Sequence, residues 1–229
     1  MKCSLDKIIS SKKIALLLIS FLILVIHGNS VFFDFTNLDD DLLIRKNENI
    51  RSFSNIVKIF NPKEVPYSKF TDYLPLRDLS HMVEYTIWKL NPMGYHAVNL
   101  LLYILCVILT YLLAFKITKK TEIALVASLI FAVHPVHVES VSWLAGRKDV
   151  LFFIFYLLSF IFYLEHIEKD RRIYLLLSLG LFILSLFSKS MGITLPIVLL
   201  VYNWTIRKVR IKSLLPFFVI SFIFGLLFY

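Results

Sequence analysis

Residues 96–115 read HAVNLLLYILCVILTYLLAF, a run of 20 residues without Asp, Glu, Lys or Arg. An α-helix needs about 20 consecutive apolar residues to cross the hydrocarbon core of a bilayer. Strongly apolar stretches also cover residues 14–33, 122–137, 150–165, 173–188, 191–206 and 213–229. Backbone groups have no partner in lipid, and no stretch alternates like a barrel strand. The sequence therefore predicts an all-α integral membrane protein, a polytopic helical bundle with about seven spans.

The composition supports lipid as the solvent of this chain. Hydrophobic residues make up 58% of its 229 residues and mean hydropathy is +0.75, whereas soluble domains are roughly 45–50% apolar. The net charge of +9 comes from basic residues that lie mostly between the apolar runs, so nucleic acid is not an expected partner. With only two cysteines, Cys3 and Cys106, neither a disulfide framework nor a cysteine metal site is expected.

Basic residues also predict the orientation, because cytoplasmic loops carry an excess of Lys and Arg. Such residues precede the first apolar run, and they recur in every second connection, near 116–120, 169–172 and 207–212. This side, with the N-terminus, is therefore expected to be cytoplasmic. The first run could be a cleaved signal peptide or a signal anchor, and the lack of a small-x-small cleavage site favours the anchor. The external connections are then 34–94, about 138–149, and 188–192.

The expected organisation has three parts. Residues 1–33 form a cytoplasmic tail and anchor span, 34–94 form the first external loop, and 95–229 form a multi-span domain. Within the loop, residues 76–90 have apolar positions at helical spacing, which predicts a helix lying in the membrane interface. The last apolar run reaches Tyr229 without a polar flank, so the membrane domain is expected to be incomplete.

The first external loop opens with FDFTNLDDD at 33–41, which places Asp39, Asp40 and Asp41 just beyond a span. Adjacent carboxylates raise one another's pKa and attract cations, which suits a general base or a metal-bound sugar phosphate. The same residues would also suit a solvated turn or the first turn of a helix. Composition alone favours the second interpretation.

Residues 134–150, HPVHVESVSWLAGRKDV, concentrate ionisable side chains beside the membrane, where such residues usually have a function. Arg147 and Lys148 could hold a phosphate, with Lys189 of the next external connection as a third cation, or they could be interfacial anchors. The proline at 135 is typical of a broken helix beside a cavity. The other candidate residues of this segment are His134, His137, Glu139 and Asp149. Its histidines and glutamate invite a zinc site, but the spacing is not HExxH, so neither a metal nor another cofactor is expected.

Three stretches carry a family resemblance. Residues 73–103 (YLPLRDLSHMVEYTIWKLNPMGYHAVNLLLY), 134–163 (HPVHVESVSWLAGRKDVLFFIFYLLSFIFY) and 188–203 (SKSMGITLPIVLLVYN) resemble, in that order, the membrane half of the transmembrane and tetratricopeptide-repeat proteins and their bacterial relatives. The resemblance implies a GT-C glycosyltransferase fold. It also implies transfer of mannose or a similar sugar from a dolichyl- or polyprenyl-phosphate donor to an acceptor, either a protein Ser/Thr hydroxyl or a glycan.

The resemblance also assigns roles. It implies Asp40, with Asp39 beside it, as the general base, and Arg147, Lys148 and Lys189 as donor-phosphate ligands, so that three external connections form one site. It places that site at the external face of a bacterial or archaeal membrane, or in the lumen of the endoplasmic reticulum. A non-catalytic membrane scaffold is the main alternative, and a transporter is less favoured because no repeated half is seen.

Overall fold

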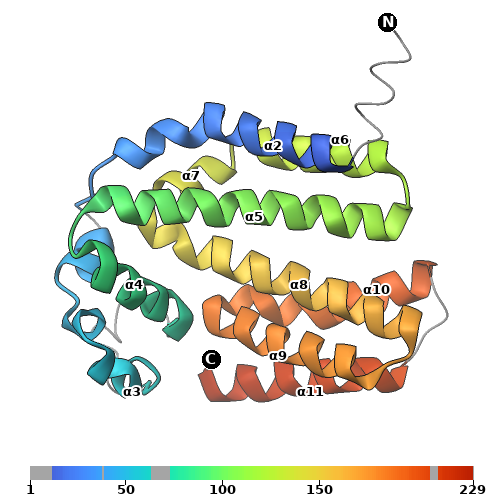
Figure 1. Ribbon diagram of the computed structural model, residues 1–229. Coiled ribbons are helices and arrows are strands. Elements are labelled where there is room, and N and C mark those ends of the chain that lie inside the picture. The colour runs from blue at the N-terminus through green and yellow to red at the C-terminus, as the bar shows by residue number, and fades with distance from the viewer. Residues whose placement is uncertain (1–11, 38, 63–72, 207–210, 229) are drawn as a thin grey trace, which may run out of the picture.

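The computed structural model describes residues 12–37, 39–62, 73–206 and 211–228, and all regular elements in these ranges are helices. Figure 1 shows them as long, roughly parallel rods with a group of short helices at one end. The longer helices are α2 (Lys12–His27), α4 (Pro75–Trp88), α5 (Pro92–Thr118), α6 (Thr121–Val133), α8 (Arg147–Lys169), α9 (Arg172–Ser188), α10 (Leu195–Ile206) and α11 (Ile211–Phe228). The shorter ones are η1 (Gly28–Phe32), η2 (Asp41–Arg45), η3 (Glu48–Arg51), η4 (Phe53–Asn55), α3 (Ile56–Ile59), α7 (His137–Ser142), η5 (Leu144–Gly146) and η6 (Ser190–Thr194).

Each predicted apolar run is matched by a helix, which confirms the all-α polytopic membrane class. Three segments, Lys12–Phe32, Pro92–Thr118 and Leu144–Lys169, are long and apolar enough to cross a bilayer, and four shorter apolar helices accompany them. The run predicted at 122–137 is shorter than expected, because α6 ends at Val133 after 13 residues. His134 is extended there, as the residue before a proline usually is.

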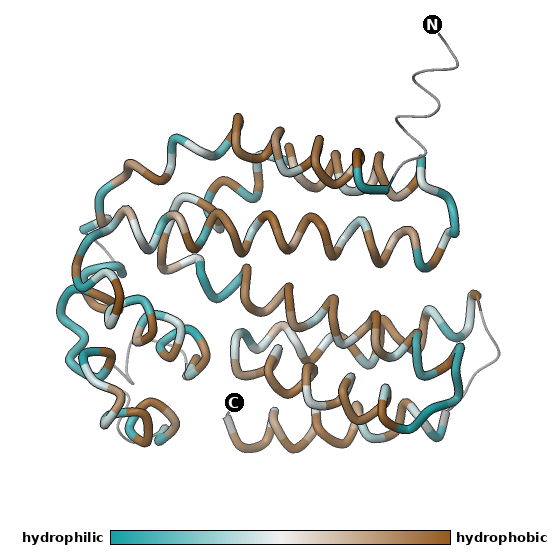
Figure 2. Tube along the Cα trace, in the orientation of Figure 1, coloured by the Kyte–Doolittle hydropathy of each residue, from teal (hydrophilic) through white to brown (hydrophobic). Residues whose placement is uncertain are grey.

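The helices pack in an order that leaves α5 and α8 at the centre. α5 packs on α2, α6 and α8, while α8 also packs on α9, and α11 packs on α9 and α10. Ser159 of α8 and Ser178 of α9 each donate a hydrogen bond to the other's backbone carbonyl, at 2.7 and 2.6 Å. Small polar residues of this kind let helices approach closely in a membrane. Figure 2 shows the long helices as mainly hydrophobic, with hydrophilic residues gathered toward both ends.

One end of the bundle collects the basic connections. Lys12 lies over the ring of Phe115 at 3.8 Å, and Lys116 pairs with Glu165 at 2.5 Å. These contacts bring together the start of α2, the end of α5 and the end of α8, as the charge pattern predicted. Several basic residues of the same pattern lie outside the described residues: Lys2, Lys7, Arg207, Lys208 and Arg210. That this end faces the cytoplasm stays a prediction.

The opposite end carries α4, which is the helix predicted over 76–90. Its charged face is turned into the protein, where Arg77, Asp78, His81 and Glu84 are all buried. Its outward face is apolar, with Ile87 63% exposed. A helix with this inverted polarity can turn its apolar face toward lipid while its charged face contacts the protein. It therefore suits a position at the membrane interface.

Candidate functional site

Three connections at this end of the bundle meet one another. The carboxylate of Asp40, from the first loop, accepts a hydrogen bond from the backbone N–H of Ala145 at 3.0 Å. Asp149, four residues further on, forms an ion pair with Lys189 of the third connection. The predicted convergence of the first loop, segment 134–150 and the Lys189 turn is therefore present in the structure.

The carboxylate of Asp40 is fully buried and engaged by protein groups. Its Oδ2 accepts hydrogen bonds from the N–H and the hydroxyl of Thr36 at 3.0 and 2.8 Å, while its Oδ1 accepts the bond from Ala145. A general base needs an oxygen that can reach the acceptor hydroxyl. In this structure Asp40 instead ties the first loop to the turn that precedes α8.

The neighbouring aspartates have different environments. Asp39 is exposed, and no hydrogen bond or ion pair to its carboxylate is found among the described residues. Asp41 forms ion pairs with Arg45 at 2.7 Å and Lys46 at 3.2 Å. The hydrogen bond from Lys46 holds the pKa of Asp41 below its usual value. Of the three aspartates, Asp39 has the carboxylate most accessible to a substrate.

Arg147, which the sequence predicts as a ligand of the donor phosphate, is fully buried. Its Nη1 donates to Glu84 Oε1 at 2.6 Å, its Nε to Asn99 Oδ1 at 2.8 Å, and its Nη2 to the carbonyl of Tyr95 at 2.9 Å. The ion pair with Glu84 compensates a charge that would otherwise be costly to bury. This geometry assigns Arg147 to holding α4 and α5 against the start of α8, because no face of the guanidinium is open to a ligand.

The arginine belongs to a larger buried network that sequence reasoning missed. Asn99 also donates to the carbonyls of Ser140 and Val141 at 2.9 and 2.7 Å, which anchors the end of α7 to α5. The second oxygen of Glu84 accepts from His81 Nδ1 at 3.0 Å. The signal that could have found these residues is the charged face of α4, where His81 and Glu84 lie three positions apart, opposite the apolar face.

His81 is expected to make this network sensitive to acid. Burial, with the positive charges of Arg147 and Arg77, keeps the pKa of His81 below the ordinary 6.5, although Glu84 opposes this shift. A proton added at Nε2 would be buried where this atom has no partner among the described residues. The unfolded chain therefore binds the extra proton more readily, and stability is expected to fall as the pH falls below 6.5.

A His81→Gln variant tests this expectation, because glutamine can donate to Glu84 but does not titrate. Thermal unfolding in detergent, followed from pH 7.5 to 5.5, should show a smaller loss of stability in the variant than in the wild type. Equal pH dependence of the two proteins would assign the acid sensitivity to other groups.

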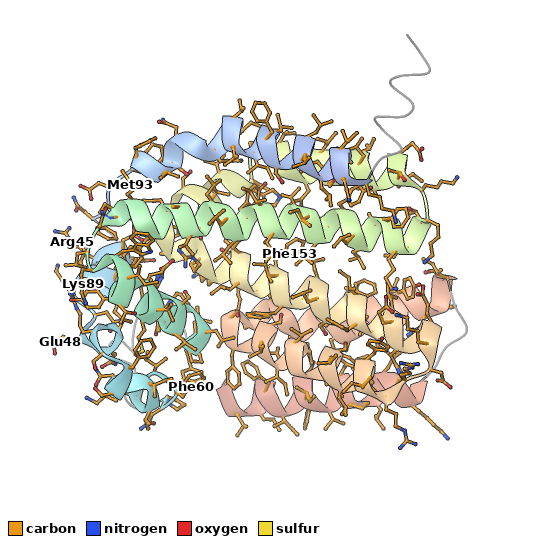
Figure 3. All side chains as sticks on the ribbon, in the orientation of Figure 1. Arg45, Glu48, Phe60, Lys89, Met93 and Phe153 are labelled. Atoms are coloured by element: carbon orange, nitrogen blue, oxygen red, sulfur yellow. The ribbon has the colours of Figure 1, made fainter. Side chains whose placement is uncertain are left out.

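Beside the Asp149–Lys189 pair lies an apolar cavity of about 440 Å³. It lies between α5, α6, α7 and α8, and Figure 3 shows Phe153 in the space between α5 and α8. Its polar lining residues include His137, Ser140 and Asp149, and Val136 next to the helix-breaking proline also lines it, as expected for a broken helix. The apolar and aromatic lining residues are Tyr103, Cys106, Phe131, Val136, Val150, Phe152, Phe153 and Met191. Such a cavity fits an apolar chain with a polar group at its rim.

Of the remaining candidates of segment 134–150, only His137 lines this cavity. Lys148, at the start of α8, is half-buried, and no ion pair to it is found in the described part of the chain. His134 and Glu139 are exposed, and the ring of His137 lies tilted against that of Phe131, with 4.1 Å between centroids. No group of three His, Cys, Asp or Glu placed to hold a metal ion occurs among the described residues.

The comparisons with known proteins agree with this architecture. Residues 68–228 match the family model described as dolichyl-phosphate-mannose-protein mannosyltransferase. The chain belongs to this family. The matched region of this family member includes α4, the buried Arg147 network, the cavity and the Lys189 turn, whereas the three aspartates lie before it.

Curated relatives give the same result. Protein O-mannosyl-transferase TMTC1 of Mus musculus is 36% identical over 142 residues, which cover 57% of this chain and 15% of the relative. Protein O-mannosyl-transferase TMTC2 of Homo sapiens is 30% identical over 222 residues, covering 89% of this chain and 26% of the relative. The chain thus spans about a quarter or less of the length of these relatives. No solved structure matches it.

Proposed function

We propose that this family member takes part in transferring mannose from a dolichyl- or polyprenyl-phosphate donor to a protein hydroxyl at the external or luminal face of its membrane. The observation that carries the proposal is the apolar cavity lined by Asp149, which forms an ion pair with Lys189 and follows the turn that Asp40 anchors. The family match and the names of the curated relatives support the same reaction class.

In this proposal the first isoprene units of the donor occupy the cavity. Lys148 precedes the lining residue Asp149 in the sequence, and Lys189 forms an ion pair with it, so we assign both lysines to attracting the donor phosphate as point charges. Lys189 would then exchange part of its pairing with Asp149 for the phosphate. The buried Arg147 acts as a positioning residue for the segment that carries Lys148.

Asp39 is the proposed general base, since its carboxylate is exposed and adjacent to the anchored Asp40. The acceptor hydroxyl oxygen forms a bond to the anomeric carbon of mannose, and its proton passes to Asp39. The bond between that carbon and the phosphate oxygen breaks, and the lipid phosphate leaves with the electron pair. Attack from the face opposite the phosphate inverts the anomeric centre, and the two lysines stabilise the departing charge.

A cavity-filling substitution tests the donor site. Val136 is 64% exposed and lines the cavity, so Val136→Trp should fold normally while its indole obstructs the mouth of the cavity. Photo-crosslinking with a photoreactive isoprenyl-phosphate mannose should label the reconstituted wild-type protein, and Val136→Trp should reduce this labelling at least tenfold.

Val133→Trp is the matched control, because Val133 is 49% exposed at the end of α6 but does not line the cavity. This variant should be labelled like the wild type. If Val136→Trp is labelled as strongly as Val133→Trp, the cavity is not the donor site. A wild-type protein that takes up no donor would favour a non-catalytic membrane scaffold.

A further inference from the structure

A second cavity, of about 730 Å³, lies in the first external loop and plays no part in the proposed transfer reaction. It is built by η2, η3, η4 and α3 on one side and by Tyr85 of α4 on the other. Four cationic side chains line it, together with a single carboxylate: Arg45, Lys46, Arg51, Lys58 and Glu48. A polar cavity with this surplus of positive charge favours an anionic ligand.

Ion pairs within the described residues neutralise only part of the positive charge in this cavity. Arg45 and Lys46 share the carboxylate of Asp41. Lys58 has no ion pair among the described residues. Among the described residues, its charge is therefore not neutralised by a carboxylate.

Arg51 is held in place at the wall of the cavity. Its guanidinium donates to the carbonyl of Arg45 and lies over the ring of Tyr85, with 4.5 Å between the guanidinium carbon and the ring centroid. Stacking on an aromatic ring leaves other N–H groups of an arginine free to donate. Arg51 and Lys58 are thus the cations best placed to bind an anion.

The neighbouring surface is apolar rather than polar. Val57 is 75% exposed, Phe53 49%, and Ile56 and Phe60 40% each, all within the segment that carries Arg51 and Lys58. Figure 3 shows Arg45 and Glu48 along the outer edge of this part of the molecule. Exposed aromatic and aliphatic side chains beside clustered cations are typical of segments that lie in the headgroup region of a membrane.

We propose that this cavity, bounded by Arg45, Lys46, Arg51, Lys58 and Tyr85, binds the phosphate of an anionic phospholipid headgroup while the apolar side chains of α3 and η4 enter the interface. The loop is connected at both ends to long apolar helices, through Phe32 and Pro92, so it stays close to the bilayer. The apolar outer face of α4, with Ile87 exposed, extends the same membrane-facing surface. The site is separate from the donor cavity and does not depend on the transfer reaction.

Hydrogen–deuterium exchange in nanodiscs tests this proposal locally. Backbone amides of residues 48–59 should exchange more slowly in nanodiscs that contain phosphatidylglycerol than in nanodiscs of phosphatidylcholine alone. Each basic residue near an anionic surface strengthens the attraction by roughly fivefold. Lys58→Gln should therefore raise the phosphatidylglycerol content needed for half-maximal protection by about that factor, and Arg51→Gln/Lys58→Gln should abolish the protection.

Two controls make the result specific. Glu48→Gln removes the carboxylate of the cavity and should increase protection, whereas Lys119→Gln/Lys120→Gln alters the opposite end of the bundle and should leave it unchanged. Glycerol 1-phosphate added to phosphatidylcholine nanodiscs should give no protection. Equal exchange in both lipids, full protection of Arg51→Gln/Lys58→Gln, or protection by soluble glycerol phosphate alone would each overturn the proposal.

Discussion

Replacing Asp39 with Asn is expected to lower the rate of mannose transfer at least about a hundredfold, since general-base catalysis typically contributes 10²–10⁴-fold. The substitution keeps the size of the side chain but removes its ability to accept the acceptor's proton. Because Asp39 is exposed, the thermal stability of the variant should equal that of the wild type. Transfer of mannose to a serine- or threonine-containing peptide, with the protein reconstituted in lipid, measures the effect.

Asp40→Asn provides the matched comparison, because the two aspartates are adjacent but only Asp40 is buried. An amide cannot accept at both ends, so an N–H of Thr36 or Ala145 would lose its acceptor, at a cost of about 1–3 kcal/mol in stability. Transfer should fall together with stability in this variant. If Asp40→Asn instead abolishes transfer at full stability while Asp39→Asn remains active, Asp40 is the base.

Replacing Arg147 with Met is expected to destabilise the fold by about 3–5 kcal/mol, because Glu84 would remain buried without its partner. Asn99 and the carbonyl of Tyr95 would also lose a donor. Thermal unfolding in detergent should show a large drop in midpoint temperature. Lys148→Met, at the next position, removes the same charge from a side chain that forms no ion pair within the described part of the chain, and it should leave the midpoint unchanged.

The double variant Arg147→Met/Glu84→Leu separates a structural role from a binding role. Replacing both partners of a buried ion pair by apolar residues is often neutral or stabilising. The double variant should therefore recover most of the lost stability, and it should retain donor labelling if Arg147 only positions the segment. A stable double variant that no longer takes up donor would show that Arg147 contributes to donor binding.

Much of the membrane architecture was predictable from local sequence. Each long apolar run must form a helix in lipid, and the runs at 96–115 and 150–165 lie in two of the three helices long enough to span. The alternating basic connections predicted which helix ends lie together, and contacts such as that of Lys116 with Glu165 agree. The boundary of α6 was less predictable, because the helix stops two residues before Pro135.

For the candidate site, the sequence predicted the segments but not the state of each residue within them. The density of ionisable residues in 134–150, and a family resemblance, were enough to select the segment and to predict that it meets the first loop and Lys189. These signals could not predict which of two residues of the same charge in this segment is buried and which is accessible. Arg147 and Lys148 are neighbours of equal charge, yet a helix turns by about 100° per residue, so one is buried against Glu84 and the other is half-buried at the surface.

By itself, then, the sequence determined the lipid environment, the helical class, the grouping of helix ends and the segments of the candidate site, because each depends on the composition of a local stretch. Only the tertiary structure decided which aspartate is accessible and which arginine is paired. Asp40 meets Ala145 across 105 positions and Arg147 meets Glu84 across 63. The availability of a charged group depends on such distant partners, since a buried charge must find one and an exposed charge need not.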